Sequence, residues 1–397
     1  MRSGSRRPRR AMKSSEHVSQ AEGKQARSAA TRPVALFLPN LLEGGAERIA
    51  VYLANGLTAR RQEVDIVVER AEGAYLADVS PEVRLVVLGA RRAVRAVCPL
   101  ARYLRSTRPK VLITTHLHSG VAAILARRFS RAGTRIIATI QTTLSARGEL
   151  AGGPISRLER IAIKRYLVRA DALVACSCGT ADDFARFVGV PREGIRVIYN
   201  PAIENRIEEM AGEPVDHPWF APGGPKVVLG VGRLTPPKDF FTVVRALALL
   251  QKSEEVRLVI LAEGEDRGRL ERLVQELRLE NRVSMPGFVK NPFAYLARAH
   301  AFVFSSLREG LPTVLIEALA LGVPIVATDC KYGPREILQD GRYGRLVPVG
   351  DAQAMADALR SALREPRQVV PPQVLQPFTL DGATDRYVEL IAELTGR

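Results

Sequence analysis

Two glutamates with seven residues between them could act together on one ligand. Glu309 follows a short apolar run at residues 301–304, whereas Glu317 lies inside the apolar stretch 315–319. Pro312, between them, suits the first turn of a helix, so the segment predicts a strand, a loop and a helix. Ligands sit at the carboxyl ends of parallel strands, and a helix start offers free N–H groups to an anion. A sugar attached to a phosphate would satisfy both features.

Glu317 is flanked by Leu315, Ile316, Ala318 and Leu319. An uncompensated carboxylate in such surroundings is costly, so we expect it to pair with a cation or to face a polar ligand. For either glutamate taken alone, a solvated surface carboxylate is the plain alternative.

Cations and glycines follow other predicted strands. Arg233 and Lys238 come directly after the apolar run 226–231 and flank a turn stiffened by two prolines. They could aim two positive charges at one diphosphate. Gly44 and Gly45 lie between a first strand and its helix, where glycine lets the backbone approach a phosphate closely. The plain alternatives are surface cations and an ordinary turn.

Strands and helices alternate along most of the chain, which is the pattern of doubly wound parallel sheets. We expect a disordered basic arm at 1–33, a first Rossmann-like domain at 34–200, a second at 201–376, and a final helix at 377–397 that packs back on the first domain. The expected strands are 34–38, 64–68, 83–88, 111–115, 135–140, 172–175, 195–199, 226–231, 256–261, 282–285, 301–304 and 325–328.

Composition limits the class of protein. The chain has 397 residues, 46% of them hydrophobic, which is normal for two globular domains. It contains no uninterrupted run of about 18 apolar residues, so a transmembrane helix is not expected. Its four cysteines, at 98, 176, 178 and 330, match no zinc or redox spacing. We expect a reducing compartment and no metal cluster, with Cys176 and Cys178 packed in a core.

The net charge of +16 is concentrated in two segments. Residues 1–33 hold nine cations against two anions, and residues 91–170 hold seventeen against two. Within 155–169 an apolar set alternates with cations, as in a helix that lies on an anionic membrane surface. The apolar set is Ile155, Leu158, Ile161 and Ala162, and the cations are Arg157, Arg160, Lys164, Arg165 and Arg169.

Taken together, these motifs resemble the retaining glycosyltransferases of family 4, over residues 34 to 397. The resemblance is carried by Gly44-Gly45-Ala46-Glu47-Arg48, Gly232-Arg233-Leu234 with Lys238, residues 281–288 ahead of Asn291, Glu309-Gly310-Leu311-Pro312 with Glu317-Ala318, and Gly333-Pro334-Arg335-Glu336-Ile337-Leu338. It implies the GT-B fold, an α/β architecture of two facing Rossmann-like domains with a cleft between them.

The resemblance also implies roles for single residues. Arg233 and Lys238 would hold the nucleotide diphosphate, Glu317 would accept hydrogen bonds from the ribose hydroxyls, and Glu309 would contact the transferred sugar. Catalysis would rest on Glu309, Arg233 and Lys238. Gly45 would contact the diphosphate through its backbone, and Gly44, Gly310 and Leu311 would also belong to the donor-binding site.

One departure from the family pattern concerns the first domain. Many relatives carry a histidine after the fifth strand, where this chain has Gln141. Glutamine can hydrogen-bond a sugar but does not titrate near neutral pH. His116 and His118, after the preceding strand, could partly replace that histidine, or could be structural.

No Asp-x-Asp occurs in the chain. That pattern usually holds a divalent metal against the diphosphate, and the Arg233 and Lys238 pair would do the same without one. We therefore expect no metal and no cofactor, only a nucleotide-sugar co-substrate.

The resemblance favours a UDP-hexose or UDP-N-acetylhexosamine donor, with GDP-mannose as the alternative. The acceptor would be a glycan, a lipid-linked oligosaccharide or a glycolipid in surface polysaccharide assembly, on the cytoplasmic face of a membrane. Two other classes of protein share part of this composition or fold. A basic nucleic-acid binder is disfavoured by the low aromatic content, 6%, and by the absence of any nucleic-acid-binding signature. A GT-B relative that epimerises or phosphorolyses its substrate stays open.

Overall fold

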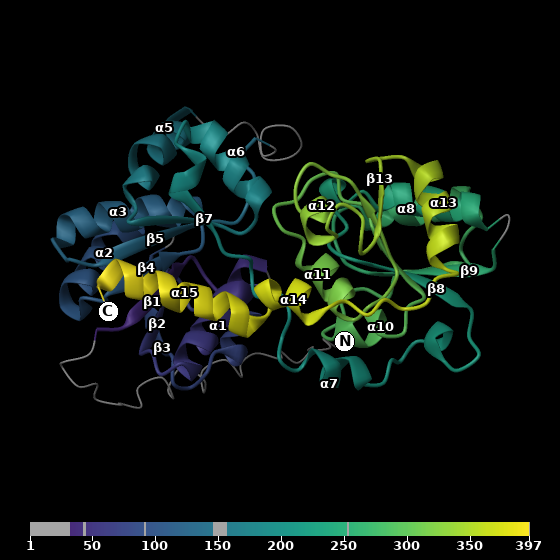
Figure 1. The fold of residues 1–397 in the computed structure, drawn as a ribbon, viewed down its shortest axis with the longest axis horizontal. Helices are drawn as coiled ribbons and strands as arrows, with labels where there is room; N and C mark the ends of the chain where they lie inside the picture. Colours follow the sequence, from purple (N-terminus) through teal and green to yellow (C-terminus); the bar gives the residue numbers. More distant parts are fainter. Residues whose placement is uncertain (1–31, 43–44, 91–92, 146–156, 252–253, 397) are drawn as a thin grey trace, which may run out of the picture.

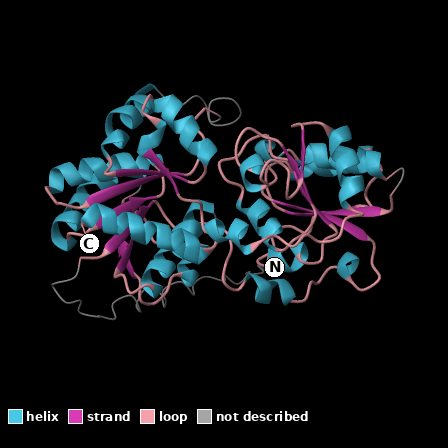
Figure 2. Ribbon diagram, in the orientation of Figure 1, coloured by secondary structure: helices cyan, strands magenta, loops and turns pink. Residues whose placement is uncertain are grey.

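The computed structural model describes residues 32–42, 45–90, 93–145, 157–251 and 254–396. Within these residues the chain forms two lobes, each built on one parallel sheet (Figure 1). Helices lie alongside the strands in both lobes (Figure 2). None of the described helices is long and apolar enough to span a bilayer.

The first sheet has the strand order β3-β2-β1-β4-β5-β6-β7. Its strands are β1 (Val34–Leu38), β2 (Val64–Val68), β3 (Arg84–Val87), β4 (Val111–Thr114), β5 (Arg135–Ile140), β6 (Ala172–Ala175) and β7 (Ile195–Val197). The helices of this lobe are α1 (Gly45–Ala59), η2 (Ala74–Asp78), α2 (Ala93–Thr107), α3 (Leu117–Ser130), α5 (Arg157–Tyr166), η3 (Leu167–Arg169), α6 (Cys178–Val188) and η4 (Arg192–Gly194).

The second sheet has the order β10-β9-β8-β11-β12-β13. Its strands are β8 (Lys226–Val231), β9 (Val256–Leu261), β10 (Val283–Ser284), β11 (Ala301–Phe304), β12 (Ile325–Thr328) and β13 (Arg345–Val347). The helices after β7 are α7 (Ile207–Gly212), η5 (Pro218–Phe220), η6 (Pro236–Lys238), α8 (Phe240–Leu250), α9 (Arg267–Glu276), α10 (Pro292–Leu296), α11 (Thr313–Ala320), α12 (Pro334–Ile337), α13 (Ala352–Ala362), α14 (Pro372–Leu375), η7 (Gln376–Phe378) and α15 (Leu380–Thr395).

Apolar runs form the central strands because both faces of these sheets are covered by helices. Every residue of β1, β2, β4 and β11 is buried. All the expected strands are present, with ends that shift by one or two residues. β13, at the edge of the second sheet, was not predicted, because three residues with an exposed first position carry little apolar signal.

The last helix returns to the first lobe. α15 packs against α1, and Figure 1 shows α15 crossing from the second lobe onto the first. A Cβ on Gly56 of α1 would lie 2.4 Å from Oγ1 of Thr384, so the two helices approach closely. Arg60, directly after α1, pairs with Asp381 at 3.1 Å and with Asp385 at 2.5 Å on α15. The chain therefore crosses twice between the lobes.

Candidate functional site

Each sheet reverses its strand order at one point, and the expected site residues lie there. In the first sheet the reversal falls between β1 and β4, and in the second between β8 and β11. Ligands of open parallel sheets bind outside the carboxyl ends of the strands at such points. Arg233 and Lys238 follow β8, Glu309 follows β11, and His116 follows β4. The topology thus places these residues where a ligand is expected.

Lys238 and Glu309 form an ion pair through Nζ and Oε1. The hydroxyl of Ser306 donates to the same carboxylate oxygen at 2.8 Å, and the buried Ser305 donates to the carbonyl oxygen of Lys238 at 2.6 Å. These bonds tie the loop after β8 to the loop after β11.

Arg233 is exposed, and within the described residues its guanidinium makes no hydrogen bond or ion pair. It is available to an anionic ligand.

Glu317 is buried in α11, with 2% of its surface exposed, and it pairs with a cation from the other lobe. Nη2 of Arg48, in the first turn of α1, lies 2.6 Å from Oε1 of Glu317 and donates to Oγ1 of Thr313 at 3.3 Å. The Glu317 carboxylate raises the pKa of Arg48 further above its usual value. The expectation that Glu317 needs a partner is met by Arg48.

The first lobe contributes His116, His118 and Gln141. His116 Nε2 lies 3.5 Å from Oε1 of Glu47 on α1, and its Nδ1 shares a hydrogen bond of 2.8 Å with Thr115. The two histidine rings are 5.3 Å apart, and His118 is the more exposed. Burial raises the pKa of Glu47. This cluster borders the same strand ends as Gln141, which follows β5.

Gly310 of the second lobe lies in close contact with Gln141 of the first lobe. A Cβ at position 310 would lie 2.8 Å from the backbone oxygen of Gln141, so only glycine permits this approach. The carbonyl oxygen of Gly310 also accepts a hydrogen bond of 2.9 Å from Ser177 Oγ. Leu311 is buried, whereas the space beside Gly45 is open. Gly44 lies outside the described residues.

A second contact between the lobes involves the segment around α12. Glu336 Oε1 accepts hydrogen bonds from the backbone N–H of Cys178, at 2.9 Å, and from the Tyr199 hydroxyl, at 2.6 Å. The ring of Tyr332 lies against Gly179, where a Cβ would be 2.3 Å from the ring.

The expectation that Cys178 packs in a core is wrong, because this residue begins α6 and is exposed. Cys176 is buried as expected.

Sequence reasoning assigned no role to Arg48, Asn200 or Tyr332. Arg48 stands inside the quoted glycine motif, and the buried charge of Glu317 was a signal that some cation must reach it. Asn200 and Tyr332 gave no such signal, since their partners come from distant parts of the chain.

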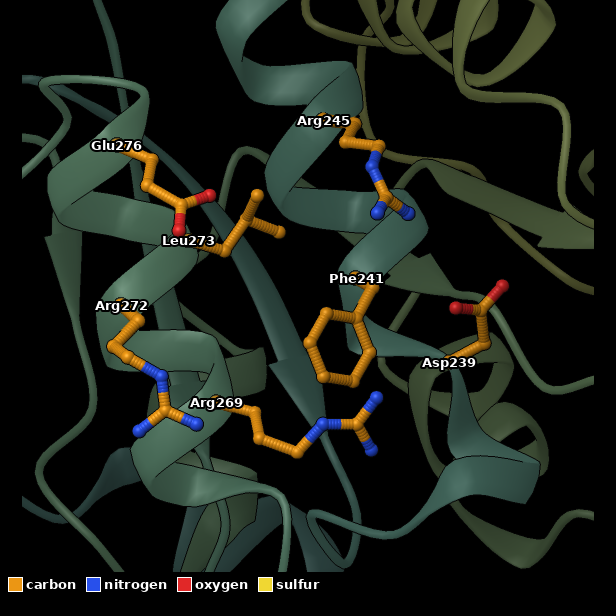
Figure 3. Close-up of a pocket in the computed structure, with 7 residues that line it drawn as sticks. All are labelled: Asp239, Phe241, Arg245, Arg269, Arg272, Leu273 and Glu276. Carbon is orange, nitrogen blue, oxygen red and sulfur yellow. The ribbon is translucent and has the colours of Figure 1, made fainter.

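A surface pocket of about 430 Å³ lies between α8 and α9, apart from these residues. Figure 3 shows Arg269 beside the ring of Phe241, with 4.9 Å between the guanidinium carbon and the ring centroid. Arg245 and Arg272 point in different directions. None of the expected site residues lines this pocket. The candidate site is therefore the region around Lys238, Glu309 and Glu317.

Two family models match the chain. The model described as Glycosyltransferase Family 4 matches residues 43–206, and the model described as Glycosyl transferases group 1 matches residues 215–371. The chain is also similar to a glycosyltransferase structure from Rickettsia africae, with a TM-score of 0.76, 15% identity, and coverage of 92% of this chain and 99% of that one. At this identity the structural likeness concerns the fold.

Two curated relatives are more similar in sequence. An N-acetylgalactosamine-N,N'-diacetylbacillosaminyl-diphospho-undecaprenol 4-alpha-N-acetylgalactosaminyltransferase of Campylobacter jejuni is 32% identical over 243 residues, 61% of this chain. The chain covers slightly less than two thirds of that protein, 64%. A GDP-mannose-dependent alpha-mannosyltransferase of Mycobacterium tuberculosis is 32% identical over 285 residues, 67% of this chain and 68% of the relative. With its two facing parallel-sheet lobes, the chain belongs to the family 4 glycosyltransferases of the GT-B fold.

Proposed function

We propose that the protein transfers a sugar, with retention of configuration, from a nucleotide-sugar donor to a hydroxyl of a glycan, lipid-linked oligosaccharide or glycolipid acceptor. The observation that carries this proposal is the arrangement of Arg233, Lys238, Glu309 and Glu317 around the strand-order reversal of the second sheet, where Gly310 lies against the Gln141 backbone of the first lobe. Cations and carboxylates meet there at the edge of the contact between the lobes.

The proposed division of roles follows from charge. Arg233 and Lys238 neutralise the diphosphate as it leaves, which is usually the largest catalytic term in such a reaction. Glu309, held by Lys238 and Ser306, contacts the sugar, and Glu317 accepts hydrogen bonds from the ribose diol. Gln141, His116 and His118 face the sugar or the acceptor. The departing phosphate takes the proton of the acceptor hydroxyl, so no separate base is required.

The donor is a UDP-hexose or UDP-N-acetylhexosamine in this proposal. The Campylobacter relative supports an N-acetylhexosamine and a lipid-linked acceptor, since its name gives N-acetylgalactosamine transfer to a diphospho-undecaprenol-linked saccharide. The Mycobacterium relative supports the alternative of a GDP-mannose donor. No divalent metal is needed, because the two cations supply the positive charge. Surface polysaccharide or glycoconjugate assembly is the corresponding pathway class.

Attachment to the inner face of the cytoplasmic membrane completes the proposal. Ile161 and Val168 expose 53% and 37% of their surface, and Phe129 at the end of α3 exposes 59%. Lys164 and Arg165 are exposed beside Ile161, and α3 packs against α5. Exposed apolar groups among cations suit an anionic lipid surface. The side chains of Ile155 and 157–160 lie outside the described set.

Release of radiolabelled sugar from UDP-sugars, measured with and without a mixture of lipid-linked acceptors, tests the function. Transfer that depends on the acceptor supports the proposal. Conversion of the donor without any acceptor would instead support an epimerase, and release that depends on inorganic phosphate would support a phosphorylase. GDP-mannose in parallel reactions separates the two donor classes.

A further inference from the structure

Glu317 is a carboxylate of the second lobe whose position depends on the first lobe. It is 2% exposed, and it pairs with Arg48, 269 residues away in the chain. Arg48 itself is fixed at a second point, by the hydrogen bond of 3.3 Å to Thr313 at the start of the same helix. The guanidinium is therefore held across the contact between α1 and α11.

The ion pair uses one oxygen of the carboxylate. Arg48 donates to Oε1, and within the described residues no hydrogen bond reaches Oε2. A carboxylate oxygen that accepts no other hydrogen bond can offer both of its lone pairs to the hydroxyls of a ribose diol, provided that the carboxylate is correctly oriented. The geometry leaves Oε2 for this purpose while Oε1 is anchored.

We infer that Arg48 is a positioning residue, which orients Glu317 so that its second oxygen receives the ribose hydroxyls of the donor nucleotide. This inference rests on the proposed function, in which Glu317 binds the ribose. Arg48 thereby sets the preference for a ribose with both hydroxyls, and it makes this preference depend on contact between the two lobes.

Without Arg48 the carboxylate has no fixed orientation. A buried carboxylate without a partner is costly, so its side chain turns toward water or toward another donor. The hydrogen bonds to the ribose then weaken, while contacts to the base and the diphosphate stay. The loss is consequently confined to ligands that carry the diol.

Binding of UDP and of 2′,3′-dideoxy-UDP, measured by calorimetry on the full chain, tests this role. The variants are Arg48→Met, Arg48→Lys, Glu317→Gln and the control Arg60→Met. Arg60 directly follows α1 and also forms ion pairs, but with Asp381 and Asp385 of α15. If the wild type binds GDP in place of UDP, GDP and its dideoxy form are used.

Arg48→Met should weaken UDP binding about tenfold or more, because a charge-assisted hydrogen bond no longer orients the carboxylate. Binding of the dideoxy nucleotide should change less than threefold. Arg48→Lys, which keeps the charge, should retain part of the preference for UDP over dideoxy-UDP. Arg60→Met should leave both affinities unchanged.

If Arg48→Met weakened the binding of UDP and of dideoxy-UDP equally, the inference would be overturned. The residue would then act on folding or on the contact between the lobes in general. Tighter UDP binding would also overturn it, since Arg48 would then compete with the ribose. If Glu317→Gln leaves UDP affinity unchanged, or the wild type binds no nucleotide, the proposed donor site itself fails, whatever Arg48 does. Arg48→Lys serves as the test if Arg48→Met does not fold.

Discussion

Asn200 Nδ2 donates a hydrogen bond of 2.8 Å to Oε1 of Gln141. This bond fixes the side-chain amide of Gln141, so its carbonyl faces Asn200 and one N–H of its NH2 group donates to Oγ1 of Thr139 at 3.4 Å, which leaves the other N–H for a ligand. Asn200 is 6% exposed, which protects the bond from water. A neutral histidine at position 141 would also offer an N–H donor. Gln141 can therefore serve as a hydrogen-bond donor that does not titrate near neutral pH.

Gln141→Ala should lower kcat by roughly tenfold without changing nucleotide affinity, because it removes one contact to the sugar or acceptor. Gln141→His should retain most of the activity. Steady-state kinetics with a natural acceptor provide the measurement, and Thr142→Ala, the exposed neighbouring residue, is the control. Equal kinetics for Gln141→Ala and Thr142→Ala would remove Gln141 from the site.

Glu309→Ala and Lys238→Ala should each lower turnover at least about a hundredfold while the protein stays folded. Each variant removes a contact that strengthens in the transition state, and each leaves the other member of the ion pair without its partner. Lys226→Ala is the matched control, since Lys226 begins β8 at the end opposite to Lys238 and its ammonium group donates to the Leu363 carbonyl, at 3.3 Å. Near wild-type kcat in either site variant, with a natural acceptor, would contradict the assignment.

Activity should survive saturating EDTA, because Arg233 and Lys238 supply the charge that a metal ion would otherwise provide at the diphosphate. Sugar transfer is measured after dialysis against EDTA and again after addition of Mg²⁺ or Mn²⁺. Loss of transfer that either metal restores would show that the diphosphate is neutralised in another way. Inhibition that neither metal reverses would indicate damage to the protein, and a lower concentration of chelator would then be used.

The first lobe should bind anionic vesicles in sedimentation assays, and high salt should release it, since exposed charges are screened beyond about 8 Å at 0.15 M ionic strength. Replacing Lys164, Arg165 and Arg169 by Gln should abolish this binding. The control replaces three exposed cations of the second lobe, Arg245, Arg272 and Arg278. It removes equal charge and should leave vesicle binding unchanged. Equal binding to neutral and anionic vesicles, or to neither, would contradict the prediction, and a chain lacking 1–33 tests whether that segment contributes.

The folded protein should lose stability as pH falls below about 6.5. Burial, together with Lys226 and Arg367, holds the pKa of His300 below its ordinary value, and burial also lowers the pKa of His217. Below about pH 6.5 these two histidines are protonated in the unfolded chain but stay neutral in the folded chain. Protonation therefore favours unfolding, until the pH falls below the pKa values of the histidines in the folded state. Urea midpoints at pH 7.5 and 5.5 measure this effect.

His300→Asn should reduce that acid sensitivity. His300 Nδ1 accepts a hydrogen bond of 3.1 Å from the backbone N–H of Val227, and the side-chain oxygen of asparagine can accept the same bond without titrating. An unchanged difference between the two midpoints would show that other groups cause the acid sensitivity. His118→Asn, at an exposed position, is the control.

Local sequence determined the elements that carry the site. β8, β11 and α11 follow from apolar runs ended by proline and glycine, because burial on both faces of a parallel sheet leaves a continuous apolar signal. The spacing of the motifs alone predicts Arg233, Lys238 and Glu309 in the loops after two strands, and Glu317 in the helix that follows the second of these loops. Their approach within the second lobe follows from the sheet topology that this pattern specifies.

Tertiary structure alone decided which groups meet between the lobes. Arg48 and Glu317, from different lobes, are 269 residues apart, and packing within the first lobe likewise joined Asn200 and Gln141, which are 59 apart. The fit of Tyr332 against Gly179 and of Gly310 against the Gln141 backbone depends on how two finished lobes are oriented. Such contacts leave no periodic pattern in either partner, since each depends on the shape and rotation of whole domains. The buried charge of Glu317 indicated that it needs a partner, but only the approach of the two lobes, which brings the Arg48 side chain to α11, identified that partner.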